Sequence, residues 1–488
     1  MKLFNIKKLT VAFSLVMGLL IFIPIDLLSN PNEMPVTTSS KEALKLFMTA
    51  RDKIENIEFN AAIELLDKSI EKDPNFALAY VYRSMAGGGF NAAWPHLQKA
   101  IKLVEKVTPG EKAFIMYNKA ASENDGRNQI KYLNQLLEMY PKDKRIQSLA
   151  GIYYYSSGDY ERSIKYLKES INIDNKYAPA YNMVGYAHSA LNQLPEADTA
   201  FKKYINLIPD NPNPYDSYAE FLMKTGRYDE SIENYLKSFN KDKRFTSALL
   251  GVGHNYVFKG NFNKAREYYN MRMDNAINPN EKTSAMFWIA TSYIHEGKLN
   301  DALIAVEKER AMAEKEKMMT TVIGTYNTEG FILVESGKFD EGMKKFDMAV
   351  QMTNKSELPE TVKKTYLLSS SMNRCYALTA MNNVDGAKDV LAECQAVIEA
   401  REDPNEVKFL HSLLAMIDLK KGNFDDAIKN FAKSDMQDPY NWFYLATVYE
   451  KKGEKEKADQ LYAKVAGLNE NSLGFALVRD RAREKMMK

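Results

Sequence analysis

Between positions 40 and about 466, apolar residues return at spacings of three and four, in stretches separated by short polar turns. This spacing places the apolar side chains on one face of an α-helix. Turn formers punctuate the pattern, for example Pro74, Pro209 and Pro439 in loops between stretches. The pattern therefore predicts an all-α chain made of many short amphipathic helices.

A repeat of 34 residues becomes visible when units are counted from Lys144. Four units share small residues at the eighth and twentieth places and bulky residues at the seventeenth and twenty-fourth. The small residues at the eighth place are Gly151, Gly185, Ala219 and Gly253, and the bulky residues at the twenty-fourth are Leu167, Phe201, Tyr235 and Tyr269. We interpret each unit as an antiparallel helix pair in which the small residues allow close approach.

The middle of each unit carries a residue suited to a left-handed helix end: Gly158, Asn192, Gly226 and Gly260. A single helix pair leaves one apolar side exposed unless another pair stacks on it. The units must therefore form a solenoid in which each pair contacts its neighbours.

The chain resembles the tetratricopeptide repeat family in several stretches. Trp442 to Tyr449 followed by Gly453, Ala458 and Tyr462 is the best match, and Gly422 to Ile428 with Phe431 and Pro439 is nearly as good. The resemblance implies a right-handed superhelical solenoid of stacked antiparallel hairpins. We expect about eleven or twelve of them.

The spacing of these signals divides the chain. We expect a signal peptide or membrane anchor at 1–28, a linker at 29–39 and divergent units at 40–143. Regular units follow at 144–275, units with longer helices at 276–470 and a capping helix at 471–488. Ser39-x-x-Glu42 predicts a capping box at the start of the first helix.

The N-terminus has the layout of an export signal. Lys2, Lys7 and Lys8 precede an apolar run from 9 to 25. Seventeen helical residues span about 26 Å, slightly short of a bilayer core of about 30 Å. Cleavage and retention as an inner-membrane anchor both remain open. Either one predicts an exported protein of the periplasm or cell envelope.

Composition excludes several classes of function. The 66 Lys and Arg against 64 Asp and Glu leave a net charge of +2, which disfavours a nucleic-acid binder. Five scattered His and two Cys predict no metal site, no disulfide framework and no cofactor. Cys375 and Cys394 are expected to be buried free thiols, because their places in a hairpin put the Cα atoms too far apart for a disulfide. A chelating or redox pair is the alternative.

The family resemblance implies a binding groove on the concave face, formed by the first helix of each hairpin. The residues that we select there are Asn182, Tyr186, Asn213, Asp216, Glu220, His254, Phe258, Phe287, Thr291 and His295. The Lys and Asn of the family's carboxylate clamp are absent, since Asp216 and Glu220 occupy one pair of those places. This surface favours a neutral or basic segment with apolar anchors. The alternative is that these side chains pack against one another inside a tight superhelix.

These observations lead to a non-enzymatic, extracytoplasmic scaffold that binds protein or peptide partners of the envelope. A glycan or small-molecule binding protein is the first alternative, although the chain lacks a large insertion that would build a sugar pocket. A hydrolase with a carboxylate pair is the second, and it requires such a pair in a cleft with a raised pKa. The oligomeric state and the partner stay open.

Overall fold

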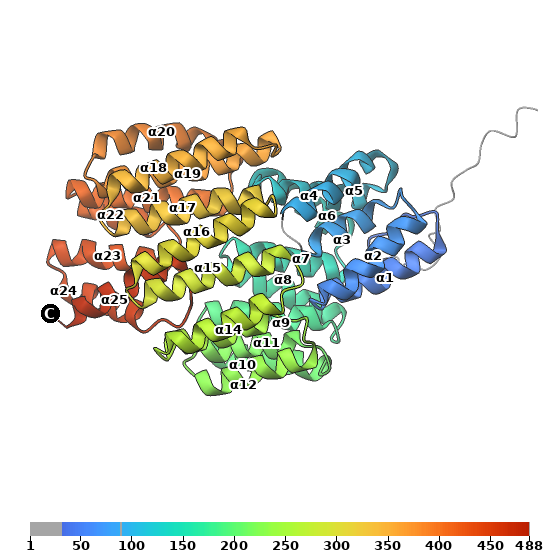
Figure 1. Cartoon of the computed structure of the whole chain (residues 1–488). Helices are drawn as coiled ribbons and strands as arrows, with labels where there is room; N and C mark the ends of the chain where they lie inside the picture. The colour runs from blue at the N-terminus through green and yellow to red at the C-terminus, as the bar shows by residue number, and fades with distance from the viewer. Residues whose placement is uncertain (1–31, 88–89, 488) are drawn as a thin grey trace, which may run out of the picture.

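The computed structural model describes residues 32–87 and 90–487 (Figure 1). These residues form 25 α-helices and one short 3-10 helix, Val104–Lys106, and no strand. Consecutive helices pair into twelve antiparallel hairpins, and one further helix follows them. The predicted all-α solenoid of stacked hairpins is confirmed.

The hairpins have the following bounds. They are α1 (Lys41–Glu55) with α2 (Phe59–Lys72), α3 (Ala77–Met85) with α4 (Phe90–Lys102), α5 (Pro109–Ser122) with α6 (Gly126–Met139), α7 (Lys144–Ser156) with α8 (Tyr160–Ile173), α9 (Ala178–Ala190) with α10 (Leu194–Leu207), and α11 (Asn213–Lys224) with α12 (Tyr228–Lys241). The second six are α13 (Ser247–Phe258) with α14 (Phe262–Asp274), α15 (Pro279–His295) with α16 (Leu299–Lys315), α17 (Met319–Glu335) with α18 (Phe339–Lys355), α19 (Glu360–Ala380) with α20 (Val384–Arg401), α21 (Pro404–Lys421) with α22 (Phe424–Phe431), and α23 (Pro439–Lys452) with α24 (Lys455–Ala466). The last helix is α25 (Leu473–Met486).

The residues at the middle of the regular units have the predicted left-handed backbone. The φ angles are 80° at Gly158, 57° at Asn192, 78° at Gly226 and 74° at Gly260. Glycine adopts this conformation without steric cost, and Asn is the side chain that tolerates it best. The turn between the two helices is therefore encoded locally.

The small eighth residue of a unit receives the bulky twenty-fourth residue of the same hairpin. A Cβ added to Gly151 would lie 2.4 Å from Leu167, and one added to Gly253 would lie 2.2 Å from the Tyr269 ring. Tyr269 is fully buried, so its ring has no free space to move into. This contact sets how closely the two helices approach.

Gly253→Ala is expected to destabilise the protein by about 1–3 kcal/mol, because the new methyl group overlaps the buried Tyr269 ring. Gly324→Ala is the matched control, since it is also helical and its added Cβ meets nothing within 4 Å. That change should stabilise the protein by about 0.5–1 kcal/mol. Urea unfolding followed by circular dichroism measures both, and equal effects would contradict this account.

The predicted capping box at Ser39 is wrong by one residue. The N-cap of α1 is Ser40, whose side chain accepts from the backbone N–H of Ala43. Ser39 instead donates its backbone N–H and its hydroxyl to the Asp73 carboxylate. A reciprocal capping box does form at Thr108 and Glu111, where α5 begins.

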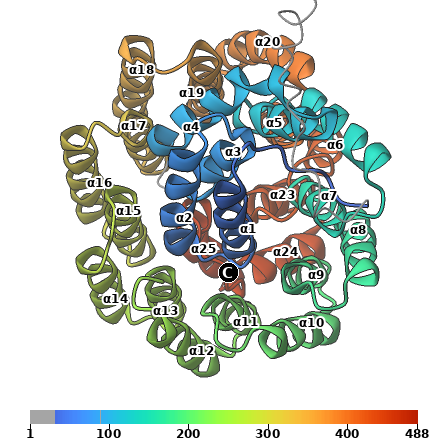
Figure 2. The ribbon, with the colours of Figure 1, turned by 90° about the vertical axis from the view of Figure 1, so that its right-hand side faces the viewer.

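The superhelix makes contacts between hairpins far apart in sequence. Figure 2 shows α5 to α20 following one another around a rim. Where the turn closes, Arg401 at the end of α20 donates to the backbone oxygen of Glu123 at 2.8 Å, and Arg127 pairs with Glu402. Lys408 on α21 donates to the backbone oxygen of Ser157 at 2.7 Å. One superhelical turn therefore rests on another.

The expected export segment at 1–28 lies outside the described residues. Among residues 32–87 and 90–487, no helix is both long enough and apolar enough to cross a membrane. Cys375 and Cys394 lie within the described chain, and both are buried and free. Burial raises the pKa of the Cys375 thiol to about 12 and that of Cys394 to about 11.

Candidate interaction surface

Part of the predicted concave face is covered by the C-terminal end of the chain. We call residues 467–486 the C-terminal strap. The strap follows α24, and its helix α25 packs on α23 and α24 and also against α15, several hairpins earlier (Figure 2). It therefore lies inside the superhelix as well as at its end.

Asn471 of the strap bridges two of the predicted groove residues. Its side-chain nitrogen is 3.0 Å from Nδ1 of His254, and its side-chain oxygen is 2.9 Å from Nε2 of His295. The amide donates to Nδ1 of His254, which requires that imidazole to be neutral, and it accepts from Nε2–H of His295. Burial lowers the pKa of His254 to about 3 and that of His295 to about 4, which agrees with this arrangement.

Aromatic and cationic groups hold the rest of the strap. Phe475 is fully buried, with its ring 5.7 Å from His295 and 6.4 Å from Phe258. The Arg479 guanidinium lies 5.4 Å from the centre of the Phe258 ring. Phe258 thus packs against the chain's own C-terminus.

The strap is also anchored by charge. Arg481 pairs with Glu335 at the end of α17, which also accepts from the hydroxyl of Tyr440 at 2.8 Å. Lys224 at the end of α11 lies 3.7 Å from Glu470 of the strap and 3.1 Å from Glu220. Together these contacts fix the strap from α11 to α23.

The other predicted residues around the strap are held by local contacts. The Tyr186 hydroxyl donates to Glu220 at 2.8 Å. Phe287 packs edge-on against Trp288, and the Thr291 hydroxyl donates to the backbone oxygen of Phe287. Asn182 is buried, and its side-chain oxygen has no partner among the described residues.

Asn213 and Asp216 lie elsewhere, in an open cavity of about 800 Å³. We call it the Asp216 cavity. Residues of α2 and α3 form one wall, and the starts of α11, α13 and α15 with Arg272 of α14 form the other. The hairpins that bound it are separated by some 150 residues of sequence, so it exists only because the superhelix curves back on itself.

Asp216 has an unusual environment. Its Oδ1 atom is buried and has no hydrogen-bond partner among the described residues. Burial, followed by the nearby Glu220 carboxylate, raises the pKa of Asp216 to about 8, and Arg272 opposes this rise only weakly. The carboxyl group is therefore largely protonated at neutral pH.

The Asp216 and Glu220 carboxyl groups do not line the same cavity. A hydrolase needs both carboxyl groups on one cleft, flanking the bond that is cleaved. Among the described residues, Asp216 lines the cavity and Glu220 does not. Glu220 is instead occupied by Tyr186 and Lys224.

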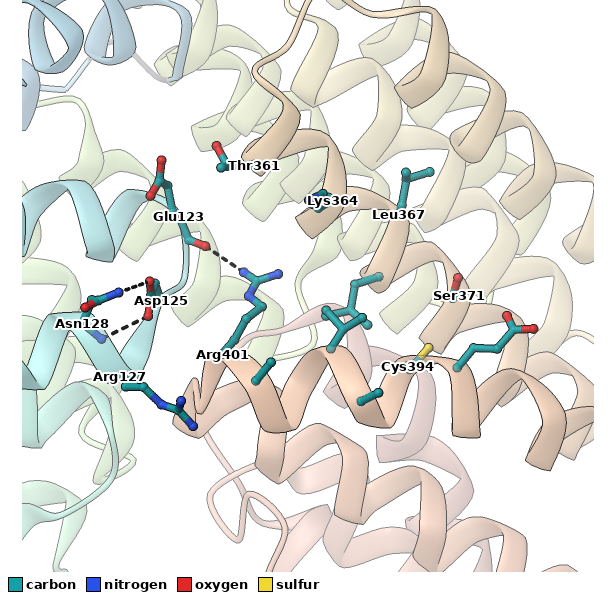
Figure 3. Close-up of a pocket in the computed structure, with 15 residues that line it drawn as sticks. Glu123, Asp125, Arg127, Asn128, Thr361, Lys364, Leu367, Ser371, Cys394 and Arg401 are labelled. Carbon is teal, nitrogen blue, oxygen red and sulfur yellow. Dashed lines mark hydrogen bonds between the residues drawn. The ribbon is translucent and has the colours of Figure 1, made fainter.

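A second cavity, of about 860 Å³, lies where α6 approaches α19 and α20 (Figure 3). Leu367, Leu368 and Val397 form an apolar wall. The polar groups at its end are already satisfied, since Arg401 donates to the backbone oxygen of Glu123 and Asn128 donates to Asp125. This cavity is part of the closure between superhelical turns.

The sequence reasoning missed Arg272 and the strap. Arg272 is on the second helix of its hairpin, outside the places assigned to the groove, although a buried Arg at a core position of α14 is a usable signal. The strap was expected to cap α24 alone. Among the described residues, no group of three or more His, Cys, Asp or Glu could hold a metal ion.

Comparisons with known proteins identify the repeat. Residues 145–177 and 178–211 match one family model described as tetratricopeptide repeat, and residues 440–472 match a second model of the same description. The two matches at 145–211 coincide with the hairpins α7–α8 and α9–α10. The chain therefore contains tetratricopeptide repeats.

The chain is similar to parts of larger proteins. It is 23% identical over 197 residues to anaphase-promoting complex subunit 3 of Schizosaccharomyces pombe, which covers 40% of this chain and 29% of that protein. It is 24% identical over 252 residues to the TPR repeat-containing protein MJ1428 of Methanocaldococcus jannaschii, covering 47% and 42%. The chain thus spans less than half the length of these relatives. The crystal structure of the APC/C hetero-tetramer Cut9-Hcn1 aligns with a TM-score of 0.42 at 13% identity, over 86% of this chain and 76% of that one.

Proposed function

We propose that this chain of tetratricopeptide repeats is a non-enzymatic scaffold of a bacterial cell envelope, and that it binds a segment of a protein partner inside its superhelix. The observation that carries the proposal is the C-terminal strap. The inner surface of α11 to α17 already holds this segment through Asn471, Phe475 and Arg481. The same kind of surface binds a segment of another chain by the same contacts.

The partner enters at the Asp216 cavity, because this part of the inner surface is not covered by the strap. The cavity adjoins the strap-covered region through α11 and α13, which contribute to both. A volume of about 800 Å³ is in the range of specific ligand pockets. A preformed solenoid binds without the cost of ordering its own backbone.

The N-terminal sequence supports the proposed location in the cell envelope. The lysines at positions 2, 7 and 8 before the apolar run 9–25 follow the layout of an export signal, and the run also offers a means of membrane attachment. Fractionation of cells with an antibody to the mature chain tests this part. Recovery in the cytoplasm would overturn the envelope location and leave the binding proposal standing.

A photo-crosslinking residue placed at Ile277 tests the binding site. Ile277 lines the cavity and is 48% exposed, so its replacement disturbs little packing. We expect a discrete crosslinked product in cells, detected by blotting as a shift in mass. Adding Asp216→Lys should abolish it, because the lysine replaces the carboxyl group with a positive charge in a cavity that Arg272 also lines.

The matched control is the same crosslinker at Met348 on α18, which is 38% exposed and does not line the Asp216 cavity. It should give no discrete product. Equal products at both positions, or a product at Ile277 that survives Asp216→Lys, would count against the cavity as the binding site.

A further inference from the structure

Among the ionisable residues that line the Asp216 cavity, the Asp216 carboxyl group and the Arg272 guanidinium do not meet. Asp216 projects from α11 and Arg272 from α14, and both line the cavity. No hydrogen bond or ion pair joins them within the described residues, although each lies close enough to affect the pKa of the other. The carboxyl group and the guanidinium group therefore belong to residues that line the same cavity, and they do not bond to each other.

Arg272 is poorly satisfied for so buried a cation. It is 8% exposed, its Nε has no hydrogen-bond partner among the described residues, and its one hydrogen bond runs from Nη1 to the Ser284 hydroxyl at 3.3 Å. Burial lowers the pKa of the guanidinium. A buried cation with so few hydrogen bonds is costly, and a ligand oxygen on the guanidinium would reduce that cost.

Asp216 lacks a donor in the same way. Its Oδ1 is buried without a partner, and the neighbouring Glu220 makes the local potential more negative. The group that best satisfies this position is a cation with several N–H donors. An ammonium group has both properties.

We propose that the Asp216 cavity binds an α-ammonium group together with the carbonyl oxygen next to it, the ammonium on the Asp216 carboxyl group and the oxygen on the Arg272 guanidinium. This chemistry is shared by the N-terminal residue of a peptide and by a free amino acid. Asn213 and Thr246 also line the cavity and supply further polar groups.

The cavity walls indicate the accompanying side chain. Ile63, Phe245 and Ile277 line the same space as the two charges. An apolar first side chain would cover these groups and be removed from water on binding. The expected ligand is thus an N-terminal residue of the Leu or Phe type.

This inference rests on the proposed function, because it names the part of the partner that enters the cavity. The scaffold function and the recognition of an α-ammonium group can fail separately. A crosslinked protein that enters the cavity by an internal loop would support the scaffold function and refute the recognition of an α-ammonium group. Conversely, tripeptide binding without any crosslinked protein in cells would support the chemistry and refute the scaffold.

Titration calorimetry with the tripeptide Leu-Ala-Ala, N-acetyl-Leu-Ala-Ala and L-leucine tests the inference on the full chain. The free tripeptide should bind at least about tenfold more tightly than its acetylated form, which has no ammonium group. Equal binding of L-leucine would identify a free amino acid as the source of the same chemistry. Equal binding of the acetylated form, or no binding of any probe, would overturn the inference.

Proton release provides a readout that simple packing does not affect. Asp216 is largely protonated in the free protein at pH 7, because its pKa is about 8. Binding of an ammonium favours the ionised carboxylate, so a proton leaves, and the measured heat at pH 7 should differ between phosphate and Tris buffers. Affinity should be highest near pH 8, because below it Asp216 is protonated and above it the ligand ammonium is lost.

The charged and titratable groups that face Asp216 come from every element around it. They are Glu220 on its own helix, Tyr186, Tyr204 and Tyr235 on α9, α10 and α12, Arg272 on α14, Glu281 on α15, Arg244 before α13, and Glu64 and Arg83 on α2 and α3. Arg83 and Arg244 already pair with Asp67 and Asp242. Asp216 is therefore the carboxyl group expected to release the proton.

Asp216→Asn is the decisive variant, since it keeps the shape and removes the charge. It should weaken tripeptide binding at least about tenfold and abolish the dependence of heat on buffer. The variant is expected to fold, because the charged form of Asp216 is disfavoured in the native protein. Asp229→Asn is the control, since Asp229 lies on α12 with an exposed side chain and should leave both readouts unchanged. Unchanged binding in Asp216→Asn would refute the proposal.

Discussion

The buried pair His254 and His295 is expected to lose several kcal/mol of its contribution to the unfolding free energy as the pH falls from about 6.5 to about 4. His254 and His295 are buried in their neutral forms beneath the strap, with pKa values of about 3 and about 4. In the unfolded chain both histidines titrate near pH 6.5, so at these two sites the unfolded state binds more protons throughout this window. The contribution of the two histidines to the unfolding free energy is complete above pH 6.5. It is lost as the pH falls toward their pKa values in the folded state.

The local consequence is release of Asn471. Protonation of His254 places an N–H where the Asn471 amide already donates, so the bridge between the two histidines breaks. Buried carboxyl groups have the opposite effect on stability, because they stabilise the folded state as the pH falls. Burial raises the pKa of Glu309, like that of Asp216, to about 8, and both favour the folded state as the pH falls.

Comparison with the double variant His254→Gln, His295→Gln isolates the histidines. Urea unfolding of both proteins at pH values from 7.5 to 4 gives two curves of free energy against pH. The wild-type curve should fall relative to that of the variant below pH 6.5. Parallel curves across the whole range would show that the histidines are not buried as neutral groups.

Phe475→Ala is expected to destabilise the chain by about 3–5 kcal/mol, the cost of removing a fully buried aromatic side chain. The ring joins the core formed by α23 and α24, which includes Trp442, to the inner surface at Phe258. Its loss leaves a void on both sides. The strap should detach before the rest of the solenoid unfolds.

Hydrogen exchange locates this effect. Backbone amides of residues 473–486 should exchange much faster in Phe475→Ala, while those of α7 to α10 should not change. Met486→Ala, on the same helix at a position 51% exposed, is the control and should alter neither stability nor exchange. Uniform acceleration along the chain would contradict independent detachment of the strap.

Much of the hairpin architecture was predictable, because its determinants are close in sequence. Gly158, Asn192 and Gly226 mark turns whose backbone only a few residue types adopt. Gly253 and Tyr269 are sixteen positions apart and meet within one hairpin. Stacking of neighbouring hairpins follows from the apolar side that each one exposes.

The binding residues were only partly predictable. The family resemblance selected Asp216 and His254 from their places in the repeat, because equivalent places face the same side of a regular solenoid. It did not place Arg272 in the same cavity as Asp216, because that proximity depends on how far α14 turns relative to α11. The N-cap of α1 was also mispredicted for a tertiary reason. Ser39 donates to the distant Asp73 carboxylate, and Ser40 is the N-cap instead.

The sequence by itself determined the helices, their turns and the order in which hairpins stack, because each of these depends on residues within about one repeat. Only the tertiary structure decided that the strap lies against His254 and His295, and that the hairpins of α2 and α11 enclose a cavity. The physical reason is that small rotations between neighbouring hairpins add up along the solenoid. Contacts between its distant parts depend on that sum, which no single repeat encodes.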